Sequence, residues 1–337
     1  MKCLEFFAGI GGFHYAFQEA GLQVILRALD INTVTNSIYK YNFPNTEIQQ
    51  CNIEKLTKDY YDDYNADIWT LSPPCQPFTG KGLKKDLKDR RCLALRSICC
   101  ALAIMKHPPR YIILENVCGF EMSEAHHLLK ETLMKSSYYF EEYIISPTEI
   151  GIPNSRPRYY LLAKLITHCV TIPSTSQIAN VWPTDNAANI QQKAIDAYLC
   201  DEANQDSSLV ILHKTVERFG NVMSFVAPHS LYSSCFTKSY YRYVAGTGPI
   251  LLVLSDVIQD NDMNIGQLKN FVLDDNYKNL IHCQFRYFSW REVANLLGFP
   301  KTFSKPLDIS EKQMYRALGN SINVSGVALL IRHLIKL

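Results

Sequence analysis

The first thirty residues constrain the fold of this chain more than any other segment. A short apolar run, Leu4 to Phe7, precedes a glycine-rich turn, Ala8 to Gly12, and a helical apolar pattern that Gly21 ends. Val24 to Leu29 then has the composition of a buried strand and stops at Asp30. This order predicts a β-α-β unit, in which the two strands run parallel.

Further strands and helices alternate along the first half of the chain. The expected strands are Asp67–Leu71, Tyr111–Leu114, Tyr143–Ile145 and Tyr159–Leu162. Between two of them, apolar residues from Leu95 to Met105 have helical spacing, and Pro108-Pro109 stops that helix. The alternation predicts an α/β domain with a parallel sheet and right-handed crossovers.

The pattern becomes irregular after Lys164, and regular helices return only near the end. Two capping boxes, Ser289-x-x-Glu292 and Ser310-x-x-Gln313, open helices there, and an apolar stripe from Val324 to Ile335 marks a last one. We therefore predict one discontinuous domain, residues 1–164 and 286–337, that carries a smaller inserted domain, residues 165–285.

Composition excludes several classes of protein. With 47% hydrophobic and 20% charged residues in 337, the chain is typical of a globular protein rather than a disordered one. Its longest strongly apolar run, Ile250 to Leu254, is far shorter than the ~20 residues of a membrane span. Eleven cysteines without regular spacing argue against a disulfide framework and for a reducing compartment. No Cys-x-x-Cys pair occurs, so we expect no metal site.

The charge balance limits how the chain can bind nucleic acid. The net charge is +2 and the isoelectric point is about 7.9, whereas domains held by bulk charge usually exceed ~9. A local basic surface on a nearly neutral body is compatible with these values. One candidate is the loop that contains Lys81, Lys84, Lys85, Lys88, Arg90 and Arg91. We predict that this loop binds phosphate groups; the alternative is an ordinary solvated loop.

The glycine turn and the acid after the second strand suggest a nucleotide site. Open α/β sheets bind nucleotides at such turns, and an acid about 20 residues further on typically holds ribose hydroxyls. Here that acid is Asp30. The third glycine of the dinucleotide fingerprint is missing, so the pattern favours an adenosine ligand without a required pyrophosphate. The alternative is a tight turn beside an ordinary surface aspartate.

Three further groups at strand ends could carry chemistry. Cys75 in Ser72-Pro73-Pro74-Cys75-Gln76 follows a strand directly and is a candidate nucleophile, or else an inert cysteine. Glu115 could bind a base edge or move a proton, or could be only a solvated cap. Arg156 and Arg158 precede the next strand, where their guanidinium groups could bind carbonyl or phosphate oxygens or remain surface charges.

Taken together, these motifs resemble the cytosine-5 methyltransferase family. The motifs are Phe7–Gly12, Pro73-Pro74-Cys75-Gln76, Glu115-Asn116-Val117, Arg156-x-Arg158 and Gly319-Asn320-Ser321, in that order and with the family's gaps. The resemblance covers the whole chain. It implies a Rossmann-like, S-adenosylmethionine-dependent methyltransferase fold of the α/β class with an inserted, smaller target-recognition domain.

One segment of the inserted domain resembles a subgroup signature. Cys235-Phe236-Thr237, followed by Lys238, is similar to a motif of the eukaryotic tRNA-aspartate cytosine-5 methyltransferases, which resemble DNA methyltransferases but modify an anticodon-loop cytosine. The compact length agrees with that subgroup. This resemblance implies methylation of C5 of a cytosine in tRNA, with aspartate tRNA as the expected substrate.

The resemblance also implies a role for each catalytic candidate. Cys75 attacks C6 of the cytosine, which makes C5 nucleophilic toward the methyl group of S-adenosylmethionine. Glu115 holds the exocyclic amine and N3 of the base. Arg156 and Arg158 steady Cys75 or the carbonyl of the base.

The positions implied to bind S-adenosylmethionine, or its product S-adenosylhomocysteine, come from both ends of the chain. They are Phe7, Gly9, Ile10, Gly11, Gly12, Asp30, Ile31, Asn52, Ile53, Glu54, Ser72, Pro74, Asn320 and Ser321. DNA-type relatives often carry an aspartate where Asn52 stands. The residues expected to bind nucleic acid are Lys81, Lys84, Lys85, Lys88, Arg91, Cys235, Phe236, Thr237 and Lys238.

Two alternatives to a tRNA methyltransferase stay open at this point. One is a DNA cytosine-5 methyltransferase with the same chemistry, and the other is a catalytically idle nucleic-acid-binding protein. Cys75, Glu115 and both arginines together count against an idle protein. We expect tRNA as the partner, with DNA as the alternative, a monomer without membrane attachment, and a location in the cytoplasm and nucleus.

Overall fold

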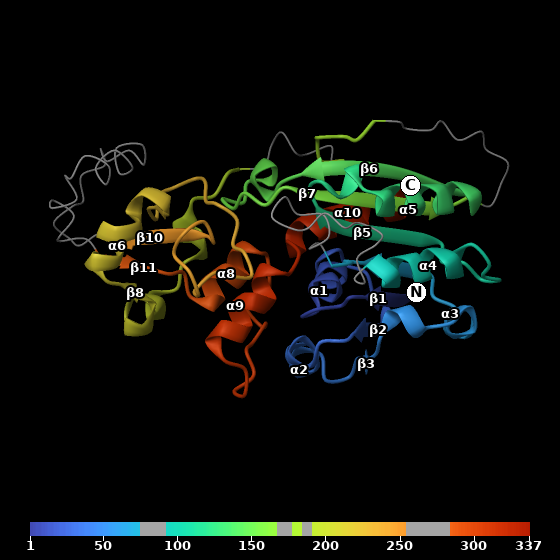
Figure 1. The fold of residues 1–337 in the computed structure, drawn as a ribbon, viewed down its shortest axis with the longest axis horizontal. Helices are drawn as coiled ribbons and strands as arrows, with labels where there is room; N and C mark the ends of the chain where they lie inside the picture. The colour runs from blue at the N-terminus through green and yellow to red at the C-terminus, as the bar shows by residue number, and fades with distance from the viewer. Residues whose placement is uncertain (75–91, 167–176, 184–190, 254–283) are drawn as a thin grey trace. The chain divides into compact units, whose positions relative to one another are not determined.

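The computed structural model describes residues 1–74, 92–166, 177–183, 191–253 and 284–337, and these form two compact units (Figure 1). The first unit consists of Met1–Glu149, Pro157–Ala188 and Val324–Leu337. The second consists of Ile150–Arg156 and Asn189–Asn323. The chain therefore passes between the units four times.

A seven-stranded sheet forms the centre of the first unit. Its strands are β1 (Lys2–Phe6), β2 (Ile25–Asp30), β3 (Glu47–Gln50), β4 (Ile68–Leu71), β5 (Tyr111–Val117), β6 (Tyr138–Ile145) and β7 (Arg158–Leu165), in the order β3-β2-β1-β4-β5-β7-β6. All strands predicted from the sequence for this region are present. The order reverses between β1 and β4, which makes the carboxyl ends of these strands the switch point of the sheet.

The prediction of an entirely parallel sheet is wrong for one strand. β7 lies between β5 and β6 and pairs antiparallel with both. The reason is the connection after β6, which holds only the short 3-10 helix Pro147–Ile150 and no crossover α-helix. Without a crossover helix the chain reverses and returns antiparallel, as it does in a hairpin.

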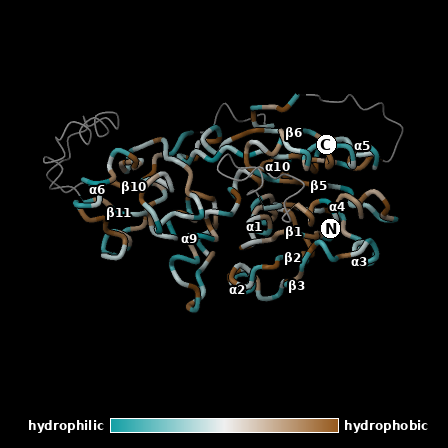
Figure 2. Tube along the Cα trace, in the orientation of Figure 1, coloured by the Kyte–Doolittle hydropathy of each residue, from teal (hydrophilic) through white to brown (hydrophobic). Residues whose placement is uncertain are grey.

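Helices cover both faces of this sheet. They are α1 (Gly12–Glu19), α2 (Thr33–Asn42), α3 (Lys58–Tyr64), α4 (Leu93–Leu102), α5 (Glu124–Lys135) and α10 (Val324–Lys336). Leu4, Phe6 and Trp69 on the strands share one buried cluster with Leu95 of α4 and Leu129 of α5. In Figure 2 the hydrophobic residues follow the strands of this unit. α10 contacts α1, β5 and β7.

The second unit is built around a small sheet. Its strands are β8 (Val210–Ile211), β9 (Ser224–Val226), β10 (Pro249–Val253) and β11 (Gln284–Arg286), in the order β8-β11-β10-β9. The helices are α6 (His213–Phe219), α8 (Trp290–Leu296) and α9 (Glu311–Gly319), with several 3-10 turns. Ile211, Phe225, Ile250, Leu252 and Phe285 form its apolar cluster.

The compact units divide the chain differently from the predicted domains. Residues 286–323, predicted to belong with the first domain, group with the second unit. Two buried side chains of this segment bond to the rest of the second unit: Glu292 of α8 accepts from the Cys200 amide at 3.0 Å, and Arg286 Nε donates to Asn204 Oδ1 at 3.0 Å. The function assigned to each domain remains a prediction.

Both predicted capping boxes are confirmed, at Ser289 with Glu292 and at Ser310 with Gln313. The stretch Glu311–Lys336 would be long and apolar enough to cross a membrane by length and composition. It contains α9 and α10, separated by Asn320–Asn323, and 56% of its most apolar window is buried inside the protein. Such burial is typical of helices in the core of a globular protein.

Candidate active site

The turn after β1 has a backbone that requires glycine. Gly9 and Gly11 have φ angles of +56° and +84°, in the left-handed region, and Phe7 shares that region at +56°. A Cβ atom on Gly11 would lie 2.8 Å from the ring of Phe43, whereas one on Gly9 would meet only ordinary contacts. The turn is therefore packed closely on the α2 side at Gly11 and open at Gly9.

Asp30, the last residue of β2, is bonded to this turn. Its Oδ2 accepts a hydrogen bond from the Gly9 amide at 2.9 Å, and its Oδ1 accepts one from the Asn32 amide at 2.8 Å. Burial raises the pKa of Asp30, and these amide bonds offset part of that rise. The neighbouring Ile31 side chain is 65% exposed. A carboxylate has lone pairs beyond these two bonds, so Asp30 can still accept bonds from a ligand.

The segment after β3 forms a short capped turn. Asn52 Oδ1 accepts from the Glu54 amide, and Asn52 Nδ2 donates to Glu54 Oε1 at 2.8 Å. The side chain of Ile53, in contrast, is buried in the main apolar cluster. Of these three predicted cofactor positions, Asn52 and Glu54 are accessible to a ligand and Ile53 supports them from the core.

The carboxyl ends of β1, β4 and β5 are joined by hydrogen bonds. The Ser72 amide donates to Phe6 O at 3.4 Å, and Asn116 Nδ2 donates to Pro73 O at 3.3 Å. The hydroxyl of Ser72 is buried and has no hydrogen-bond partner among the described residues. Cys75 follows directly in the sequence and lies outside the described residues, as do Lys81, Lys84, Lys85, Lys88, Arg90 and Arg91.

Glu115 and Arg158 are brought together on neighbouring strands of the first unit. Arg158 Nε lies 3.2 Å from Glu115 Oε1, and both side chains are largely buried. Arg158 also donates to Pro157 O at 2.7 Å. The pair holds a carboxylate in a fixed orientation one residue away from Asn116, which contacts the segment leading to Cys75. A fixed carboxylate at a strand end can bind the donor edge of a base or act in proton transfer.

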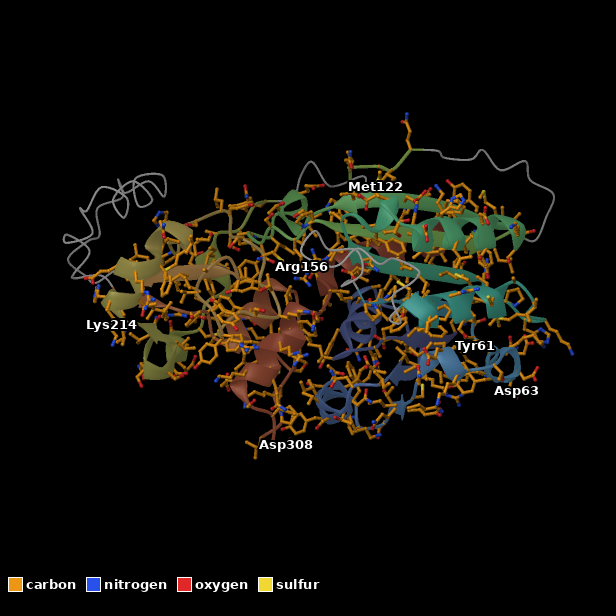
Figure 3. The ribbon with its side chains drawn as sticks, viewed as in Figure 1. Tyr61, Asp63, Met122, Arg156, Lys214 and Asp308 are labelled. Atoms are coloured by element: carbon orange, nitrogen blue, oxygen red, sulfur yellow. The ribbon has the colours of Figure 1, made fainter. Side chains whose placement is uncertain are left out.

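Arg156 is buried in the second unit, where it joins two predicted motifs (Figure 3). One terminal nitrogen donates to Phe236 O at 3.2 Å and to Cys235 Sγ at 3.3 Å. The other donates to Gly319 O at 3.2 Å and to Ser321 O. These bonds make Arg156 a clamp on backbone carbonyls, and its predicted action on Cys75 or the base stays a prediction.

The remaining predicted residues of the second unit differ in exposure. Asn320 and Lys238 are exposed, and Ser321 and Thr237 are half-buried. Phe236 is buried against the rings of Tyr240 and Phe288. Of the predicted site residues, Glu115 and Arg158 belong to the first unit, and Arg156, Asn320 and Ser321 belong to the second.

A buried polar network beneath the glycine turn was not predicted. Tyr39 of α2 donates to Glu5 Oε2 at 2.7 Å, and its hydroxyl also lies 3.1 Å from His14 Nδ1. Burial raises the pKa of Glu5 to about 8 and lowers that of His14 to about 4. The only sequence signal was an acid within the apolar first strand. This network ties β1, α1 and α2 together around the turn.

Comparison with known proteins agrees with this geometry. The model of the family described as C-5 cytosine-specific DNA methylase matches residues 1–336. A human protein named tRNA (cytosine(38)-C(5))-methyltransferase is 34% identical, over 98% of each chain. A Dictyostelium discoideum protein named DNA (cytosine-5)-methyltransferase is 32% identical, over 99% of this chain and 94% of its own. The crystal structure of the Schizosaccharomyces pombe Dnmt2 methyltransferase superposes with a TM-score of 0.82 at 34% identity, covering 100% of this chain and 98% of that one.

The sheet order and the polar groups at its switch point define an S-adenosylmethionine-dependent methyltransferase fold, which confirms the predicted fold class. Within that class, the chain belongs to the C-5 cytosine-specific DNA methylase family. The family resemblance found in the sequence is thereby confirmed.

Proposed function

We propose that this protein transfers a methyl group from S-adenosylmethionine to C5 of a cytosine in the anticodon loop of tRNA, with aspartate tRNA as the preferred substrate. The observation that carries the chemistry is the buried Glu115–Arg158 pair near the end of β5. Asn116, the residue after Glu115, contacts the segment leading to Cys75. The observation that favours tRNA is full-length similarity to relatives named for cytosine 38 of tRNA.

The residues at the switch point fit S-adenosylmethionine. Asp30 has acceptor capacity left for the ribose hydroxyls, and the exposed Ile31 offers an apolar surface for adenine. The buried Ser72 hydroxyl lacks a described partner, as expected of a group that bonds a ligand. When bound, S-adenosylmethionine supplies an electrophilic methyl group.

The chain's own residues would carry the remaining steps. The Cys75 thiolate adds to C6 of the cytosine, and the electron pair of the C5–C6 bond becomes available at C5 for the methyl group. Glu115, oriented by Arg158, binds the exocyclic amine and N3 of the base. A base then removes the proton from C5, and the sulfur–C6 bond breaks to release the thiolate. These roles follow from the family resemblance.

A tRNA loop suits this chemistry better than a duplex does. The target base must leave its stack to enter such a pocket, and a loop base is already partly exposed. A second candidate function, DNA cytosine-5 methylation, is favoured by the Dictyostelium discoideum relative, whose name states a DNA substrate. The two candidates share the catalytic residues and differ in the nucleic acid.

Methyl transfer from labelled S-adenosylmethionine tests the proposal. We expect label in aspartate tRNA, no label in a transcript whose cytosine 38 is replaced by uridine, and far less label in duplex DNA. Equal transfer to duplex DNA would refute the tRNA assignment and retain the cytosine chemistry. Binding of tRNA without any methyl transfer would instead support the idle binding protein.

A further inference from the structure

One loop of the second unit is held rigidly by its own backbone. We call residues 237–247 the tyrosine loop, because it contains three tyrosines. The Thr237 amide donates to Thr247 O at 2.8 Å and closes the loop at its base. Within it, the amides of Arg242 and Tyr243 both donate to Ser239 O, at 3.1 and 3.3 Å. The loop therefore presents its side chains in a fixed arrangement.

Two of the three tyrosines anchor the loop to the body of the unit. Tyr240 is buried; its hydroxyl donates to Pro249 O at 2.8 Å and accepts from the Phe288 amide at 2.8 Å. Tyr241 stacks on Tyr315 with ring centroids 4.8 Å apart and planes 21° apart. Both rings are thus engaged in contacts within the second unit.

The third tyrosine, Tyr243, is exposed. Tyr241 has a backbone φ angle of +66°, a value that residues other than glycine rarely adopt. After this strained residue, Arg242 and Tyr243 are exposed, and Tyr243 retains 53% of its accessible surface. The Arg242 guanidinium lies 5.1 Å from the centroid of the Tyr243 ring. Strain of this kind persists where the surrounding structure enforces it, and it often accompanies function.

The base of the tyrosine loop adjoins the residues clamped by Arg156. Phe236, the residue before the loop, offers the carbonyl that Arg156 binds. Gly319 packs directly on the loop, because a Cβ atom there would lie 2.4 Å from Lys238 N and Thr237 C. The loop that carries Arg242 and Tyr243 therefore packs against Gly319, the residue before the predicted Asn320–Ser321 segment.

The chemistry of the loop fits an unpaired nucleotide. The loop carries two cations, Lys238 and Arg242, and no acidic residue, on a chain whose whole net charge is only +2. An exposed aromatic ring stacks on an unpaired base of any identity, while the neighbouring cations contact phosphate. A protein partner would not require cations flanking the ring in this manner.

We propose that Tyr243 is a stacking platform for an unpaired base of the RNA substrate, and that Arg242 and Lys238 contact its flanking phosphates. This inference rests on the proposed function and adds the residues that hold the RNA loop. It makes Tyr243 a binding residue and assigns it no part in the chemical steps.

The test compares matched variants of the full chain. Tyr243→Ala removes the ring, Tyr243→Phe keeps it, and Tyr41→Ala removes a similarly exposed tyrosine (56%) from α2 of the first unit. We expect Tyr243→Ala to weaken binding of aspartate tRNA about 5- to 150-fold, the range for one stacked base. The other two variants should bind like the wild type. Arg242→Ala should flatten the salt dependence of binding by about 0.7 in logarithmic slope.

The outcomes separate this inference from the proposed function. Unchanged tRNA binding by Tyr243→Ala, in a preparation that methylates tRNA, would overturn the stacking platform alone. Equal losses in Tyr243→Phe and Tyr243→Ala would also overturn it, because the hydroxyl rather than the ring would then be responsible. A wild-type protein that methylates no tRNA would refute the proposed function. S-adenosylmethionine affinity, measured by calorimetry, should be the same in all variants.

Discussion

Arg158 Nε and Glu115 Oε1 are 3.2 Å apart because β7 runs antiparallel to β5. An antiparallel neighbour begins where β5 ends, so the first residue of β7 reaches the carboxyl edge of the sheet. A parallel β7 would have begun at the opposite edge, and its first residue would have been far from Glu115. The antiparallel direction of β7 thus places the Arg158 guanidinium beside the Glu115 carboxylate, the candidate catalytic group.

The first prediction concerns this pair. Arg158→Lys keeps the charge but loses the planar fork that orients Glu115. We expect kcat for methyl transfer to fall about 10²-fold, the cost of a small misplacement of a reacting group. Glu115→Gln should also lower turnover. Affinity for S-adenosylmethionine should stay near the wild-type value in both variants; a large loss of that affinity would show that the pair acts on the cofactor instead.

A second prediction concerns the residue at the end of β2. If Asp30 accepts hydrogen bonds from the ribose, Asp30→Ala should weaken S-adenosylmethionine binding by about 1–3 kcal/mol, the range for charged hydrogen bonds. The exposed Asp63 of α3 offers a matched control, and Asp63→Ala should bind normally. Titration calorimetry measures both. Wild-type affinity in Asp30→Ala would remove Asp30 from the cofactor site.

A third prediction separates two cysteines. Cys75→Ser replaces a thiol by a much weaker nucleophile and should lower methylation by orders of magnitude, with normal S-adenosylmethionine binding. Cys235, whose sulfur accepts a hydrogen bond from Arg156 at 3.3 Å, supports the clamp. Cys235→Ala should therefore reduce activity only modestly. Near-normal turnover of Cys75→Ser would contradict the covalent mechanism.

A fourth prediction concerns stability at low pH. Burial would raise the pKa of Glu142, but bonds from His126, Lys130 and Tyr159 lower it from 4.5 to about 2. A depressed carboxyl pKa stabilises the fold above pH 4.5, and this contribution is lost as the pH falls toward 2. Glu142→Gln should therefore cost about 3–5 kcal/mol of unfolding free energy at pH 7, and much less near pH 2.

Urea unfolding of both proteins at several pH values measures that difference. The matched control is Glu131→Gln, because Glu131 of α5 pairs with His127 and Lys135 only at the exposed surface. That variant should unfold like the wild type at every pH. A cost for Glu142→Gln that stayed constant between pH 7 and pH 2 would contradict the linkage.

The sequence predicted the strands of the first unit well, because long apolar runs are decisive for buried strands. It missed α2, in which only Ile38 and Tyr39 are buried, and β3, a polar edge strand with no buried residue. It also assumed that β7 was parallel, since pairing direction depends on the connection rather than on composition.

Some features of the candidate site were likewise predictable from the sequence, and others were not. Local motifs predicted that Asp30 and Glu115 lie at or near strand ends, and the structure has them there; their roles stay predictions. The contacts of Arg156 were not predictable, since its partners are 79 to 165 residues away and are mostly backbone carbonyls. A backbone carbonyl has no residue signature, so only the folded chain reveals the clamp. Glu5 was missed for a similar reason, because its partner Tyr39 lies on another element.

The passage of the chain between the units has a consequence for biosynthesis. Glu19 of α1 is bonded by Ser325 and Arg332 of α10, which are made more than three hundred residues later. At about 5–20 residues per second, the ribosome needs roughly 15 to 60 s to supply this partner. During that interval the surface of α1 that α10 covers is available to chaperones. The packing around α1 is therefore completed only after α10 has left the ribosome.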